Sequence, residues 1–204
     1  FNAVASKTKV SSTTNTTAQS ITNSIDKSAY AYIAKWNSIE DATFLAAILK
    51  ENMTPRFAEK SFSLEGNSYE KGTLVILRND NRIANFDDKL LEIANNNNRK
   101  IQAVSTGFVD TGLDFGSASV KPIKKQRVAL LSGDGTSSLS FGEVWYFFEQ
   151  ELKYPLTVIN SDYFSRTDFS NYDVIILPDG RYGSVLNQNT LDKLSTFTRS
   201  GGTL

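Results

Sequence analysis

RVALLSGDG, residues 127–135, is an apolar run that ends in a glycine turn. Two more apolar runs follow it, LTVIN at 156–160 and DVIILPDG at 173–180, and segments with helical periodicity come after the first and the third run. Short apolar strands that alternate with helices require a parallel sheet with right-handed crossovers. Residues 127–204 are therefore predicted to form an α/β domain built on parallel strands.

The helix after the first run is predicted from a capping box, in which Ser140 precedes Glu143 by three residues. Its apolar residues fall on one stripe, which is typical of a helix face packed in a core. The stripe contains Phe141, Val144, Trp145, Phe148 and Leu152.

The helix after the third run is predicted to begin near a second capping pair, Asn189 and Asp192, and to stop at Gly201. Its inner face is expected to carry Leu191, Leu194 and Phe197. A new strand is expected to open at Thr203, so we expect the parallel sheet to be incomplete at Leu204.

The part of the chain before this domain predicts a small α/β domain over residues 29–120. Apolar strands are expected in AYAYIAKW (29–36), in RFAEKSFSL and KGTLVILR on either side of the turn at 65–67, and in IQAVS (101–105). One helix is expected after the capping pair Ser38 and Asp41, and another after Asn85.

Two segments are predicted to be linkers. Residues 1–28 contain twelve Ser or Thr and no regular apolar period, so they bury too little surface to offset the entropy of ordering. Three glycines and a basic run separate the two domains, and we place the second linker at 121–126.

A candidate ligand site follows from the two glycine turns of the later domain. Both turns come at carboxyl ends of predicted parallel strands, which is the edge where open α/β sheets bind ligands. The candidate residues are Gly133, Asp134, Gly135 and Thr136 in the first turn, and Asp179, Gly180, Arg181 and Tyr182 in the second.

The chemistry of this candidate site favours a small anionic or hydroxyl-rich ligand. Backbone amides at a helix start attract anions, Arg181 can add a charge-assisted hydrogen bond, and the two aspartates can accept from hydroxyls. Alternatively, Asp134 and Asp179 only hydrogen-bond their own turns. A dinucleotide fingerprint is incomplete because Ser138 stands near where its third glycine would lie, and no phosphate-loop motif is present.

Composition excludes several classes of function. Because 22 basic residues balance 22 acidic ones, the chain has no net charge with which to hold a phosphate backbone, so nucleic acid is not an expected partner. The chain contains neither His nor Cys, which removes imidazole and thiolate metal sites, Cys nucleophiles and histidine bases. No apolar run is long enough to span a membrane, and FNAVASKTK does not resemble a signal peptide.

Four segments carry a family resemblance: KGTLVILRNDN, VSTGFVDTGLDFGS, VALLSGDGTSSLSFGEVWYFFEQELKYPLTVI and YDVIILPDG. In this order they resemble the region that follows the catalytic domain in long zinc carboxypeptidase-like proteins of bacteria. The resemblance implies a secreted or periplasmic accessory region whose partner is the upstream peptidase domain of the same polypeptide. It also implies that zinc is bound only in that upstream domain, so no cofactor is expected in this chain.

From Arg127 onward the chain also resembles the first half of a class I glutamine amidotransferase-like domain, which has a flavodoxin-like fold. That resemblance implies a nucleophilic Cys on an elbow after the next strand, beyond Leu204. Because residues 1–204 contain neither His nor Cys, we expect a non-catalytic scaffolding or interaction region. The alternatives are a small-molecule or glycan-binding module at the Asp134 and Asp179 edge and, less favoured, a hydrolase whose nucleophile follows Leu204.

Overall fold

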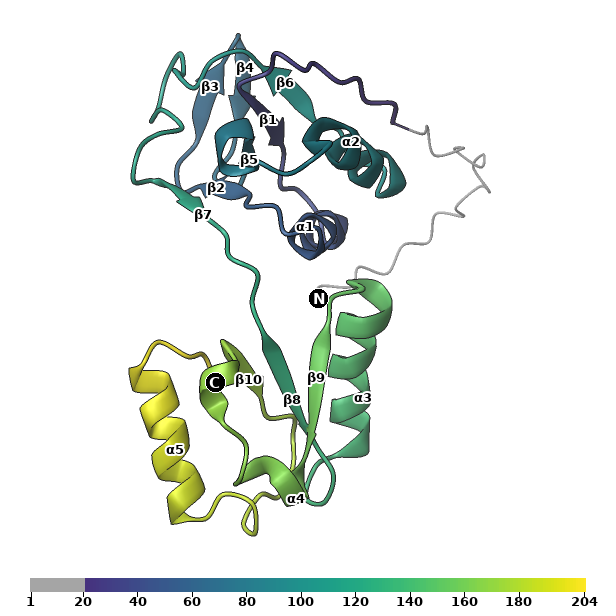
Figure 1. Cartoon of the computed structure of the whole chain (residues 1–204), viewed down its shortest axis with the longest axis vertical. Coiled ribbons are helices and arrows are strands. Elements are labelled where there is room, and N and C mark those ends of the chain that lie inside the picture. The colour runs from purple at the N-terminus through teal and green to yellow at the C-terminus, as the bar shows by residue number, and fades with distance from the viewer. Residues whose placement is uncertain (1–20) are drawn as a thin grey trace, which may run out of the picture.

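The computed structural model describes residues 21–204, which fold into two α/β units (Figure 1). The first unit comprises residues 21–123 and the second residues 127–204. Of the predicted N-terminal linker, residues 1–20 lie outside the described residues. Residues 21–28 lie against the first unit, where the buried Asn23 donates to the backbone oxygen of Arg99 over 2.7 Å and accepts from the amide of Ile101 over 2.9 Å.

The first unit is built on a five-stranded antiparallel sheet in the order β6-β1-β5-β2-β7. The two most apolar strands, β1 (Ala31–Ala34) and β5 (Leu74–Leu77), are buried along their whole length because both faces of the sheet are covered. The other strands are β2 (Arg56–Ala58), β6 (Gln102–Val104) and β7 (Val120–Pro122).

Different elements cover the two faces of this sheet. Helices α1 (Glu40–Lys50) and α2 (Phe86–Asn96) pack on one face through residues such as Phe44 and Leu90. A hairpin of β3 (Phe62–Leu64) and β4 (Asn67–Tyr69) covers the other, together with the buried Phe115.

The predicted segments of this unit are largely present, with differences at the turns. The turn at 65–67 joins β3 to β4, so RFAEKSFSL divides into two strands and KGTLVILR contributes only β5. Asn85 does precede α2, but in the left-handed conformation and without a side-chain cap. Asp41 is buried in the first turn of α1, and its Oδ2 accepts from the amides of Asn37 and Ser38.

The second unit contains a parallel sheet in the order β10-β8-β9, which confirms the predicted α/β class and the parallel strands. Its strands are β8 (Val128–Ser132), β9 (Leu156–Asn160) and β10 (Val174–Ile176). Its helices are α3 (Ser138–Tyr146), which continues as a wider π-helical segment over Phe147–Glu151, α4 (Ser161–Phe164) and α5 (Gln188–Arg199). A short 3₁₀ turn, Phe169–Asn171, precedes β10.

Both predicted capping positions in the second unit were wrong. The N-cap of α3 is Ser137, whose side chain accepts from the amide of Ser140, and the N-cap of α5 is Asn187, which accepts from the amide of Thr190. Several Ser and Asn residues follow one another at each site, and the place where the chain leaves its extended conformation decides which of them caps.

The two faces of the parallel sheet differ in burial. Helices α4 and α5 bury one face with Phe164, Leu194 and Phe197. On the other face, none of the residues of α3 is fully buried, so the predicted stripe packs only in part: Phe148 and Leu152 are partly buried against an apolar cluster, whereas Trp145 is 37% exposed. The reason is that α3 lies on this face without a second helix beside it (Figure 1).

A fourth apolar cluster joins the two units. Ala46 and Leu49 of α1 are buried together with Val128 and Tyr154 of the second unit. The Tyr154 hydroxyl donates to the backbone oxygen of Gln126 over 2.7 Å and accepts from its amide over 2.8 Å. The predicted linker 121–126 is therefore partly structured, because β7 reaches Pro122 and the Tyr154 side chain holds Gln126.

Candidate functional site

The structure places the eight candidate residues at one edge of the parallel sheet, in two loops that touch. The loop after β8 contains Gly133, Asp134, Gly135 and Thr136, and the loop after β10 contains Asp179, Gly180, Arg181 and Tyr182. Thr136 pairs with Gly180 in an isolated antiparallel bridge. The amide of Arg181 donates to the oxygen of Gly135 over 2.6 Å, and that of Ser137 to the oxygen of Asp179 over 2.8 Å.

Glycine is required where the two loops meet. Gly135 has a φ of +86°, in the region that L residues with side chains rarely adopt. A Cβ on Gly180 would overlap the carbonyl oxygen of Gly135. The loops can therefore pack backbone against backbone only because both positions lack side chains.

The helix start, whose amides were expected to face a ligand, takes part in this packing through the Ser137 amide. The amide of Asp179 donates to Oγ of Ser140 over 3.1 Å, so the start of α3 is tied to the second loop. The Tyr182 hydroxyl donates to the oxygen of Pro178, and burial raises the pKa of Tyr182. The side-chain oxygen of Thr136 is buried and makes no hydrogen bond within residues 21–204.

The charged side chains of the candidate site remain available. Asp134, Asp179 and Arg181 are exposed and form no side-chain hydrogen bond within the described part of the chain. The alternative in which each aspartate accepts hydrogen bonds from its own turn is therefore not what the described residues show. A ligand at this edge of the sheet would contact the exposed side chains of Asp134, Asp179 and Arg181, because the two loops themselves pack against each other. The ligand site remains a prediction.

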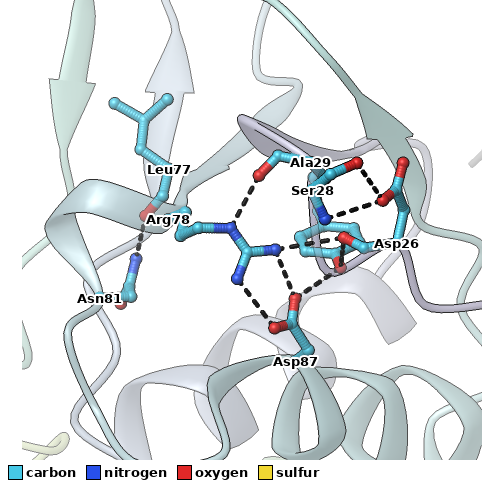
Figure 2. Close-up of polar contacts among 8 residues, drawn as sticks. Asp26, Ser28, Ala29, Leu77, Arg78, Asn81 and Asp87 are labelled. Carbon is cyan, nitrogen blue, oxygen red and sulfur yellow. Dashed lines mark hydrogen bonds and ion pairs between the residues drawn. The ribbon is translucent and has the colours of Figure 1, made fainter.

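Sequence reasoning missed a partly buried polar network in the first unit (Figure 2). Figure 2 shows the Arg78 guanidinium between Asp87 on α2 and the backbone of residues 26–29. It donates to both carboxylate oxygens of Asp87 over 2.7 and 2.8 Å and to the oxygen of Ala29 over 2.7 Å. The Tyr32 hydroxyl lies 2.7 Å from the same carboxylate.

The electrostatics of this network are those of a structural clamp. The hydrogen bonds from Arg78 hold the pKa of Asp87 below its usual value. Burial and the adjacent Asp87 raise the pKa of Tyr32 to about 12. Arg78 and Asp87 form an ion pair, and the hydrogen bonds from Arg78 hold residues 26–29 against the sheet. No local spacing signals it, because its members come from separate elements.

Within residues 21–204, no group of three or more His, Cys, Asp or Glu side chains is arranged to hold a metal ion. Over the same residues, no helix has the length and apolar character needed to cross a membrane. Comparison with known proteins gave no match to a protein-family model, a curated protein or a solved structure.

Proposed function

We propose that this chain is a non-catalytic interaction or scaffolding module of a zinc carboxypeptidase-like protein, and that it docks through α3. The observation that carries the proposal is the exposure of apolar residues around this helix. Leu139 is 73% exposed and Tyr146 55% exposed on its outer side, while Val158 of the adjacent β9 is 44% exposed. Exposed apolar surface of this kind marks interaction sites.

We also infer that the second unit is the beginning of a flavodoxin-like, amidotransferase-like domain. Its first strand, β8, lies between β9 and β10, as the first strand does in the flavodoxin-like order 2-1-3-4-5. Thr203 forms an isolated parallel bridge with Val174 of β10, and this is the side on which that order requires the fourth strand. These pairings support the inference.

The nature of the partner follows from the resemblance, which implies a peptidase domain in the same polypeptide. In this proposal the peptidase domain binds the zinc, the polypeptide is secreted or periplasmic, and this chain supplies surface rather than catalytic groups. The exposed apolar residues of α3 support a permanent partner, because permanent interfaces are more apolar than transient ones.

Calorimetric titration with the separately produced peptidase domain of the parent protein tests the proposal. The double variant Leu139→Ser/Tyr146→Ser is expected to bind at least about tenfold more weakly than the unmodified chain. The matched control is Leu191→Ser, because Leu191 is 43% exposed on α5, on the opposite side of the sheet. Equal binding by all three proteins, or no binding by any of them, would contradict the proposal.

A further inference from the structure

A cavity of about 250 Å³ opens on the first unit, away from both the loop edge and α3. It lies among β1, β4, β6, the first turn of α1 and the residues that follow α2. Its polar wall contains Lys35, Asp41, Arg99 and Lys100, and its apolar wall includes Ile33. We call it the Arg99 cavity.

Arg99 is incompletely hydrogen-bonded in this wall. Its Nε is buried and has no hydrogen-bond partner among the described residues. Its terminal nitrogens lie 3.4 Å from Asp41 and 3.5 Å from Glu40. Charge-assisted N–H···O bonds are normally about 2.7–2.9 Å long, so these two ion pairs are loose. The side chain is 24% exposed and lines the cavity.

Two lysines add positive charge at the same opening. Lys100 Nζ contacts the backbone oxygen of Thr22 over 3.3 Å, and Lys35 Nζ lies 5.6 Å from the centre of the Tyr69 ring. Within residues 21–204 neither lysine pairs with a carboxylate. The three cations therefore face two carboxylates, Asp41 in the wall and Glu40 beside it, which leaves a net positive charge.

Asp41 offsets only part of this positive charge, and it also holds the start of α1. Its Oδ2 accepts from the amides of Asn37 over 2.7 Å and Ser38 over 2.8 Å. Its side chain is nearly fully buried, so it stabilises the start of α1. The remaining attraction for an anion comes from Arg99 and the two lysines.

We infer that the Arg99 cavity binds a small organic acid. The planar guanidinium matches a carboxylate, which can accept two parallel hydrogen bonds, and the lysines flank it with further charge. The wall near Ile33 and Ala34 would contact a short hydrocarbon body, which inorganic phosphate lacks.

The test is an amide chemical-shift titration of the whole chain with butanoate and with butylammonium, which share size and apolar surface but carry opposite charge. Butanoate is expected to shift the amides of Lys35, Asn37 and Arg99, and butylammonium is expected to leave them unchanged. The double variant Lys35→Gln/Lys100→Gln should weaken butanoate binding about fivefold. Lys60→Gln/Lys71→Gln removes the same charge from exposed positions outside the cavity and should leave binding unchanged.

Arg99→Lys tests the contribution of the guanidinium group, because lysine keeps the positive charge but cannot donate two parallel hydrogen bonds to a carboxylate. We expect this variant to bind butanoate about tenfold more weakly. Equal shifts with both ligands, equal affinities in the two lysine double variants, or shifts confined to residues outside the cavity would overturn the inference. Inorganic phosphate binding as tightly as butanoate would also overturn it, since the apolar wall would then contribute nothing. The lysine variants keep the test decisive if Arg99→Lys does not fold.

Discussion

At Tyr32 a single hydroxyl links three parts of the first unit. It lies on β1, 2.7 Å from Asp87 on α2 and 2.9 Å from the backbone oxygen of Asp26. Burial disfavours the phenolate, and deprotonation would also place this charge beside the Asp87 carboxylate, so the pKa of Tyr32 rises to about 12. Because this folded-state pKa exceeds the unfolded value of about 10, the contribution of Tyr32 to stability is complete below about pH 10 and is lost as pH rises toward 12.

Tyr32→Phe should therefore have two effects. At pH 7 it should lower the free energy of unfolding by about 1 kcal/mol, because Asp87 and Asp26 lose one hydrogen-bond donor. Between about pH 10 and 12 the stability of the variant should fall less steeply than that of the unmodified chain. Urea unfolding at pH 7, 10 and 11.5 measures both effects.

Tyr163→Phe is the control, because the Tyr163 side chain is exposed and its hydroxyl makes no hydrogen bond within the described residues. It should reproduce the unmodified curve at every pH. An unchanged alkaline slope in Tyr32→Phe would show that the raised pKa of Tyr32 does not contribute to stability.

At the scale of elements, the loops after β8 and β10 form one packed unit, and Gly180 tests this directly. Gly180→Ala should lower the free energy of unfolding by about 1–3 kcal/mol, because the new methyl group meets the backbone oxygen of Gly135 and the loops must separate. Gly183→Ala, three residues later, meets no atom within 4 Å and should change stability by less than about 0.5 kcal/mol. Thermal and urea unfolding of both variants provide the comparison, and equal stabilities would show that the loops are not in contact.

The sequence predicted which segments form helices and strands more accurately than it predicted where those helices begin. LTVIN coincides with β9, because a short apolar run between polar turns has one plausible structure. The caps at Ser140 and Asn189 were misplaced by two or three residues, since neighbouring Ser and Asn residues compete and tertiary geometry selects among them. The buried state of α3 was also mispredicted, because periodicity reports which face is apolar and not whether another element covers it.

The candidate site could likewise be predicted only in part from the sequence. Topology alone predicted that the turns after two parallel strands would share an edge. The hydrogen bond from Arg181 to Gly135 could not be predicted, because it depends on the register between loops that are far apart in the sequence. The Arg99 cavity was missed entirely, since Lys35, Asp41 and Arg99 come from separate elements with no common spacing.

At the scale of the whole molecule, Tyr154 stabilises the segment that connects the two units. Tyr154→Phe removes both hydrogen bonds to Gln126 and should loosen the segment that contains Lys124 and Lys125. We expect trypsin to cut after these lysines about fivefold faster, which corresponds to about 1 kcal/mol of lost local stability. Limited proteolysis followed by mass spectrometry gives the rates.

Tyr172→Phe is the matched control for that measurement. Tyr172 packs against the cluster under α5, and its hydroxyl makes no hydrogen bond in the described part of the chain. It should leave the cleavage rate unchanged. Equal acceleration in both variants would argue against a role for Tyr154 in the junction.

The position of β7 has a consequence for how the chain folds during synthesis. β7 pairs with β2 through Ala58 and Val120, which lie roughly 60 residues apart in the sequence. At a synthesis rate of about 5–20 residues per second, β7 is therefore made roughly 3–12 seconds after β2. During that interval the backbone groups along one side of β2 are open to other chains or to chaperones. The sheet of the first unit is complete only once β7 has been made, just before β8, so β2 stays an unpaired edge until synthesis reaches the second unit.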